Sequence, residues 1–246
     1  MGRAEITLLF VGLTAATAAG QPPGPPPPRM IAVDGAGASN ACSSAIRAVA
    51  KCDGIPIEIE VFYWSHGCLK LRLDQIDVPH IRAKGAVLAD RICELRRNEP
   101  QRPLILLCYS SGCAVGLAAA ERLPANSLQR LILLEPSVSS RYDVRPGLRA
   151  SAGGVDVFCS PRDIWGLGVA MRLVGTADDF HGTDAAGRYG FQPVIEDPAD
   201  LTLYAGLRHY FWTRADRYTG HHGRHSGVYA DGYLRERVFP VIVGSP

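Results

Sequence analysis

Residues 103–115 of this 246-residue chain read PLILLCYSSGCAV, an apolar run, a serine-glycine turn and a second apolar stretch. Leu104 to Cys108 has the length and composition of a strand that is buried on both faces of a parallel sheet. The alanine-rich residues 114–123 are typical of a helix, which Pro124 should end. The stretch therefore predicts a strand, a sharp turn around Ser110 and a helix.

Strand-like and helical patterns alternate along the rest of the chain. The patterns typical of strands lie at residues 30–33, 57–63, 128–134 and 155–159, and helical patterns lie at 41–51, 79–97, around 165–174, 201–214 and 232–239, where Pro240 should end the last helix. This alternation predicts an α/β fold, a mostly parallel sheet with helices on both faces. Ligands of such sheets bind at the carboxyl ends of the strands, so functional residues should directly follow strands.

The first 28 residues differ from the rest of the sequence. Arg3 precedes an apolar run at residues 6–13, and Ala16-Thr17-Ala18 has the small-residue form that a signal peptidase accepts. We predict a signal peptide at residues 1–20 and export to the periplasm or the medium, with a membrane anchor through residues 6–19 as the alternative. Residues 21–28 read QPPGPPPP, which is typical of an extended spacer, so one folded domain should cover residues 29–246.

Charge and cysteine usage narrow the functional classes. The net charge is +2 and the basic residues are scattered, which does not favour nucleic-acid binding. The seven cysteines are an odd number without metal-ligand spacing, so we predict neither a disulfide framework nor a cysteine metal site. A dinucleotide fingerprint is missing after the first strand, and no cofactor is expected. A small-molecule or lipid-like acyl substrate fits this composition best.

Ser110 is the candidate nucleophile. It lies two residues beyond the apolar run and directly before the helix, where a strand-turn-helix corner would expose its hydroxyl group. The residues two positions before and after such a serine must be small, which holds for Gly112 and for the thiol Cys108. Ser111 is the rival, but the large Tyr109 would then flank it. The alternative for Ser110 is an ordinary helix N-cap.

Three stretches resemble the α/β-hydrolase superfamily, namely residues 103–115, Leu131-Ile132-Leu133-Leu134-Glu135-Pro136 and Val157-Phe158-Cys159-Ser160-Pro161-Arg162-Asp163. They are similar to its nucleophile turn, the strand that follows and the acid-bearing strand, and they span most of residues 30–240. The resemblance implies a single-domain α/β-hydrolase fold of serine esterase or lipase type, without identifying a substrate family. Only about 18 residues separate Pro136 from Val155, which leaves room for one short helix around 142–150 and little or no cap.

The order of residues in the superfamily is serine, acid, histidine. The resemblance therefore implies Asp163, which follows a predicted strand, as the acid, and His225, which precedes the last predicted helix, as the base. A metal site on this histidine-rich segment would lack a third ligand, and none is predicted. The alternatives are a solvated turn for Asp163, with Asp178 and Asp179 as fallback acids, and His221 or His222 as the base.

The oxyanion hole of the superfamily uses two backbone N–H groups. Ser111, directly after the nucleophile, would supply one, and the turn at Gly35 and Ala36 after the first strand would supply the other. The superfamily usually has His-Gly at this turn, whereas this chain has Asp34-Gly35, which leaves the role of Asp34 open.

These residues together predict a serine hydrolase that acts on a carboxylic ester or related acyl substrate. Ser110, activated by His225, would attack the carbonyl carbon, and water would release the acid from the acyl-enzyme. One alternative is a non-catalytic binding protein with the same fold, which the departures at Cys108 and Asp34 favour. Another is an acyltransferase that uses the same triad with a different acceptor.

Overall fold

The computed structural model of the protein describes residues 26–163 and 184–244, and within them one six-stranded sheet. Every pair of neighbouring strands is parallel, in the order β2-β1-β3-β4-β5-β6. The strands are β1 (Arg29–Val33), β2 (Glu58–Val61), β3 (Leu104–Tyr109), β4 (Arg130–Leu134), β5 (Val155–Cys159) and β6 (Leu207–Phe211). The predicted α/β architecture is confirmed, and β3 lies inside the sheet with Ser110 directly after its end.

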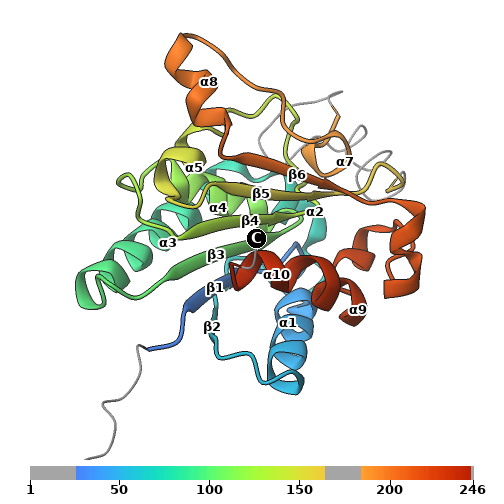
Figure 1. The fold of residues 1–246 in the computed structure, drawn as a ribbon. Helices are drawn as coiled ribbons and strands as arrows, with labels where there is room; N and C mark the ends of the chain where they lie inside the picture. Colours follow the sequence, from blue (N-terminus) through green and yellow to red (C-terminus); the bar gives the residue numbers. More distant parts are fainter. Residues whose placement is uncertain (1–25, 164–183, 245–246) are drawn as a thin grey trace, which may run out of the picture.

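Helices cover both faces of this sheet, as Figure 1 shows. One face carries α3 (Val78–Asn98), α4 (Gly112–Ala120) and α5 (Arg145–Ala150). The other carries α1 (Ala41–Cys52) and the C-terminal helical segment, which consists of α9 (Asp231–Tyr233), a π-helical turn (Leu234–Val238) and α10 (Phe239–Ile242). The short helices α2 (Leu71–Ile76), α7 (Ala186–Tyr189) and α8 (Pro198–Tyr204) lie in the connections.

The central strands are apolar on both sides because both faces of the sheet are covered. Successive side chains of a strand point to opposite faces. In β3, Leu106 packs in the core under α3 and α4, whereas Ile105 and Leu107 pack in the core under α1 and the C-terminal helices. All six residues of β3 are buried, as the continuous apolar run predicts.

Helix α4 approaches the sheet so closely that two of its glycines have no room for a side chain. A β-carbon on Gly112 would overlap the carbonyl oxygen of Asp34, and one on Gly116 would overlap the sulfur of Cys108. The thiol at position 108 is therefore tolerated because a glycine one turn along α4 leaves space for it. This packing accounts for the departure from glycine two residues before Ser110.

Two helix predictions need correction. Residues 201–214 are not one helix, because α8 ends at Tyr204 and residues 207–211 form the edge strand β6, whose hydrogen bonds with β5 override the local helical pattern. Pro240 does not end the last helix, because it lies in the first turn of α10, where its missing N–H group is not needed. The predicted helix around residues 165–174 lies outside the described residues.

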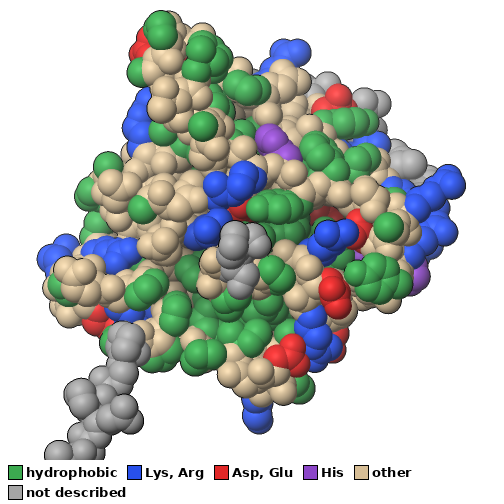
Figure 2. Space-filling view, viewed as in Figure 1, with side chains coloured by type: hydrophobic (Ala, Val, Ile, Leu, Met, Phe, Trp, Pro, Cys, Tyr) green, Lys and Arg blue, Asp and Glu red, His purple; other side chains and the backbone are tan. Residues whose placement is uncertain are grey.

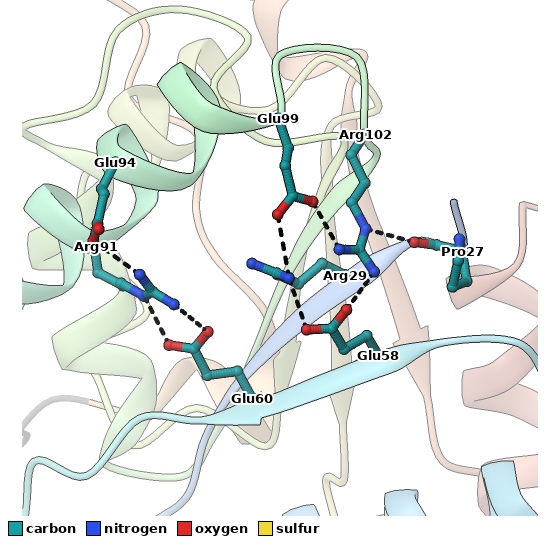
Figure 3. A network of polar contacts seen from close by, with 8 residues as sticks. All are labelled: Pro27, Arg29, Glu58, Glu60, Arg91, Glu94, Glu99 and Arg102. Carbon is teal, nitrogen blue, oxygen red and sulfur yellow. Dashed lines mark hydrogen bonds and ion pairs between the residues drawn. The ribbon is translucent and has the colours of Figure 1, made fainter. Parts of the chain in front are cut away.

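The edge strand β2 is lined with ion pairs, which Figure 3 shows from close by. Glu58 pairs with Arg29 at 2.7 Å and with Arg102 at 2.5 Å, and Glu60 pairs with Arg91 at 2.9 Å. Such exposed pairs contribute little stability individually. Charged side chains along an edge do, however, disfavour pairing with a strand of another molecule.

All seven cysteines are free. Among the described residues no helix is long and apolar enough to cross a bilayer.

A groove of about 520 Å³ lies at the amino ends of the strands, lined mainly by prolines and aliphatic residues such as Pro28, Ile57 and Ile242. Figure 2 shows the apolar surface around it, with basic side chains in separate groups.

The packing of Gly116 against Cys108 predicts the outcome of a double-mutant cycle. Gly116→Ala should lower the free energy of unfolding by about 1–3 kcal/mol, because the methyl group overpacks a rigid contact. In a Cys108→Ala background the same substitution should cost much less. Urea denaturation of the four proteins measures both values, and equal costs in the two backgrounds would contradict the proposed contact.

Candidate active site

The chain turns sharply at Ser110, between β3 and α4. Ser110 has a backbone φ of 53°, a left-handed conformation that costs a non-glycine residue about 1–2 kcal/mol. Its N–H group donates to the carbonyl oxygen of Leu134 at 3.0 Å, and its own carbonyl oxygen accepts from the N–H group of Cys113 at 3.0 Å. The turn is therefore held from β4 and from α4, and it leaves the serine partly exposed at the carboxyl ends of the strands.

His225 lies against this serine. It begins a short 3₁₀ helix, His225–Tyr229, before the C-terminal helices. Its Nε2 atom is 2.8 Å from the Oγ atom of Ser110, and its side chain is a quarter exposed. The ring of Tyr109 lies 5.1 Å from the imidazole, centre to centre. The structure thus brings the predicted nucleophile and the predicted base within hydrogen-bond distance.

Two carboxylates face the other nitrogen of this imidazole. Asp163 Oδ2 lies 2.9 Å from Nδ1, and Glu135 Oε2 lies 3.0 Å from it. Both residues are buried, Asp163 four residues beyond β5 and Glu135 directly after β4. Of these two acids, the sequence pattern predicts Asp163 but not Glu135. The signal was present, because Glu135 directly follows a predicted strand at the edge where ligands bind. Asp178 and Asp179 lie outside the described residues.

Glu135 also contacts a second histidine. The N–H group of Gly223 donates to Nδ1 of His221 at 3.1 Å, so the proton of this buried imidazole is on Nε2. That atom lies 3.3 Å from Oε1 of Glu135. His221 therefore faces the acid rather than the serine, and His222 is exposed. Glu135 itself has a φ of 43°, a second strained residue at this edge of the sheet.

The charges around His225 determine its protonation. Burial lowers its pKa, but hydrogen bonding to Asp163 and Glu135 and the charges of both acids outweigh this effect and raise the pKa to about 9. The imidazole is therefore protonated at neutral pH. It must lose this proton before Nε2 can accept one from Ser110.

The turn after β1 lies directly beside the serine. A β-carbon on Gly35 would come within 3.1 Å of the Ser110 β-carbon, which is tighter than an ordinary contact, so a glycine allows this close approach without displacing the serine. Among the described residues, the N–H groups of Ala36 and Ser111 donate to no protein acceptor. The oxyanion hole that the sequence predicts from Ser111, Ala36 and Gly35 stays a prediction.

Asp34 has a structural role, which answers the question that the sequence left open. Its Oδ1 atom accepts hydrogen bonds from the N–H groups of Cys42 at 2.9 Å and Ser43 at 3.1 Å, in the first turn of α1. Its carbonyl oxygen accepts from the indole of Trp64 at 2.8 Å. A carboxylate at a helix start is favourable, so Asp34 fixes the glycine turn against α1.

Helix α2 supports the site from the side. Asp74 accepts hydrogen bonds from the N–H group of Gly37 at 2.7 Å and from the side chain of His66, Nδ1 to Oδ1, at 2.8 Å. The neighbouring Gln75 accepts from the hydroxyl group of Ser111 at 2.5 Å. Two adjacent residues of α2 thus bind both the glycine turn and the residue after the serine, and His66 is part of this support.

A small cavity lies beside the Gly35 turn, and a set of possible cation ligands lies at His225. The cavity measures about 200 Å³ and is lined by Asp34, Gly35, Ala38, Asn40, Phe62, Tyr63, Trp64 and Ser65. One ligand atom each from Glu135, Asp163 and His225 lies within 4.8 Å of the others. A cation bound by these three residues would be coordinated by Nδ1 of His225, the nitrogen that faces both carboxylates in this structure.

Comparisons with known proteins concern the fold. No family model matches the chain, and no curated protein matches it. A solved structure of an α/β-superfamily hydrolase from Xanthomonas campestris pv. campestris is similar at a TM-score of 0.46 and 14% identity, over 89% of this chain and 99% of that one. The RedJ thioesterase of the prodiginine pathway in Streptomyces coelicolor is similar at 0.39 and 19%, over 93% and 94%. The catalytic core of acetyl xylan esterase from Trichoderma reesei is similar at 0.40 and 11%, over 84% and 98%.

These likenesses are distant and do not extend to activity or substrate. The fold rests on the geometry of the chain itself, namely the parallel sheet and the left-handed serine between β3 and α4. Between β4 and β5 the chain forms one short helix, α5, as predicted. The chain therefore has the α/β-hydrolase fold that its sequence resembles.

Proposed function

We propose that the protein is a serine hydrolase that cleaves a carboxylic ester or a related acyl substrate. One observation carries the proposal. Ser110 Oγ lies 2.8 Å from Nε2 of His225, and the other nitrogen of this imidazole faces Asp163 and Glu135. A nucleophile, a base and an orienting acid in this order are the arrangement that activates serine.

In the proposed reaction, neutral His225 removes the hydroxyl proton as Ser110 attacks the acyl carbon. The N–H groups of Ser111 and Ala36 stabilise the oxyanion. The imidazolium, held by the carboxylates, then protonates the leaving alcohol. Water deprotonated by His225 attacks the acyl-enzyme, and the collapse of the second tetrahedral intermediate returns the proton to Ser110.

Within this mechanism Asp163 and Glu135 are positioning residues of His225. Together they hold the single proton on Nδ1, so that Nε2 is the nitrogen presented to the serine. His221 contacts the second oxygen of Glu135 and limits the orientations of that carboxylate. A pair of acids stabilises the imidazolium more than one does, at the expense of a base that is free of its proton only at alkaline pH.

The cavity beside Gly35 sets the expected size of the substrate. At about 200 Å³ it is smaller than most ligand pockets, and its aromatic lining favours an apolar group. We therefore propose a short acyl or alcohol group at this position. Esters of acetic and butyric acid should be cleaved faster than esters of long-chain acids.

Export is a separate proposal, carried by the apolar run and the small residues at positions 6–18. Expression of the full chain in a bacterial host should yield a protein in the periplasm or the medium that begins near residue 21. N-terminal sequencing of the recovered protein checks this, and an intact N-terminus on a membrane-bound protein would instead support the anchor.

Ser110→Ala should lower kcat for p-nitrophenyl acetate by about 10⁴-fold or more, because no other group can form the acyl-enzyme. Ser111→Ala is the matched control. It keeps the N–H group and removes only the hydroxyl group bonded to Gln75, so its kcat should stay within about tenfold of the wild type.

Two results would contradict the proposal that the protein is a serine hydrolase. Equal activity of Ser110→Ala and wild type would exclude this nucleophile, and a folded wild type that is inert on all acyl lengths would favour the binding protein. Added alcohols that divert the acyl group from water into a new ester would favour the acyltransferase.

The raised pKa of His225 predicts an alkaline pH profile. Because the neutral imidazole is the base, kcat/KM should rise about tenfold per pH unit below 9 and level off above it. Glu135→Gln removes one of the two charges that raise this pKa, so the midpoint should move to lower pH. Asp163→Asn should shift it in the same direction, since both acids face Nδ1.

The same group makes stability depend on pH. The pKa of His225 is about 9 in the folded protein and 6.5 in the unfolded chain. The ion pairs of the protonated imidazole therefore stabilise the fold fully below pH 6.5. This contribution is lost as the pH rises through 9. Urea denaturation at pH 6 and 10 measures the difference, which should shrink in Glu135→Gln. If the midpoint of the kcat/KM profile moves in neither Glu135→Gln nor Asp163→Asn, the proposed role of the two carboxylates is contradicted.

A further inference from the structure

The segment that begins at Cys68 and ends with α2 has its polarity reversed relative to an ordinary surface helix. Its three leucines are exposed, Leu69 by 86%, Leu71 by 57% and Leu73 by 42%, and Ile76 is 40% exposed. A soluble helix normally turns its apolar residues inward. A cluster of exposed aliphatic side chains of this kind marks an interaction surface.

The polar residues of the segment account for the reversal. Asp74 and Gln75 are buried, with 0% and 5% exposure. They bind the N–H group of Gly37 and the hydroxyl group of Ser111, as described above. These hydrogen bonds turn Asp74 and Gln75 towards the site, so the opposite positions of α2, Leu73 and Ile76, face outward. Leu71, one turn before Gln75, lies at the border of the buried side and is still 57% exposed.

The charge of this surface points to the kind of partner that covers it. Lys70 and Arg72 alternate with the three leucines and are exposed, and the sole acid of residues 68–76, Asp74, is buried on the opposite side. A surface with aliphatic side chains between cations is complementary to anionic headgroups above hydrocarbon. We infer that residues Leu69 to Leu73, with Ile76, dock the protein on an anionic lipid surface.

The docking surface is joined to the candidate active site. A β-carbon on Gly37 would come within 2.7 Å of the side chain of Leu71, so this leucine covers the turn that follows β1. Tyr63, which lines the cavity beside Gly35, is also 67% exposed. Docking through α2 therefore holds the cavity next to the lipid surface.

Sedimentation with vesicles tests the inference independently of catalysis. The full chain carrying Ser110→Ala is mixed with vesicles of phosphatidylcholine alone or with 30% phosphatidylglycerol, and the bound fraction is measured. We expect binding to the anionic vesicles that weakens in 0.5 M NaCl, because salt screens the two cations. Lys70→Ala with Arg72→Ala should weaken it about 30-fold, and Leu69→Ser with Leu73→Ser at least about tenfold.

The controls are Lys51→Ala with Arg97→Ala, two exposed basic residues away from α2, and Leu201→Ser, an exposed leucine on α8. Their binding should equal that of the parent, and circular dichroism should show the same fold in every variant. No binding to anionic vesicles would overturn the inference. So would binding that is unaffected by the leucine and basic substitutions, which would assign it to another segment, or equal binding to both vesicle types. Self-association that disappears with Leu69→Ser and Leu73→Ser, without vesicle binding, would show that a second copy covers the surface.

Discussion

The left-handed turn at Ser110 sets the distances on which the rest of the site depends. Because the chain reverses there within one residue, α4 returns against the ends of β1 and β3 at nearly backbone distance. Gly112 fits beneath the carbonyl group of Asp34, and Gly116 leaves room for the sulfur of Cys108. The same closeness brings Gly35 to the serine. Hydrogen bonds to β4 and α4 hold the strained turn in place. They keep the hydroxyl group of the serine at the carboxyl ends of the strands.

Electrostatics around His225 follow from the positions of three strand ends. Parallel strands end at one edge, so acids that follow β4 and β5 meet the histidine that faces the end of β3. Two buried carboxylates around one imidazole favour its charged form, and this raises the pKa of His225 despite the cost of burial. A site of this kind stabilises an imidazolium strongly. In the proposed hydrolase this would stabilise the imidazolium formed in the transition state, and the base would be free of its proton only at alkaline pH.

Helix α2 links the site to the surface of the molecule. Its two buried polar residues hold the turn after β1 and the residue after the serine, and the exposure of Leu73 and Ile76 on the opposite side follows from that orientation. A helix of six residues has too few positions to satisfy a polar site and an apolar core together. The polar residues of α2 bind the site, and its aliphatic residues stay exposed, where the inferred lipid surface would cover them.

The sequence by itself determined the alternation of strands and helices, the strand-serine-helix turn and the place of Asp163 after a strand, because these depend on local periodicity and on chain order. It did not determine that residues 207–211 form a strand, since pairing with β5 outweighs a short and ambiguous pattern. Nor did it identify Glu135. Only the tertiary structure decided which acids and which histidine meet, because such contacts join residues up to 115 positions apart and depend on which strand ends lie side by side.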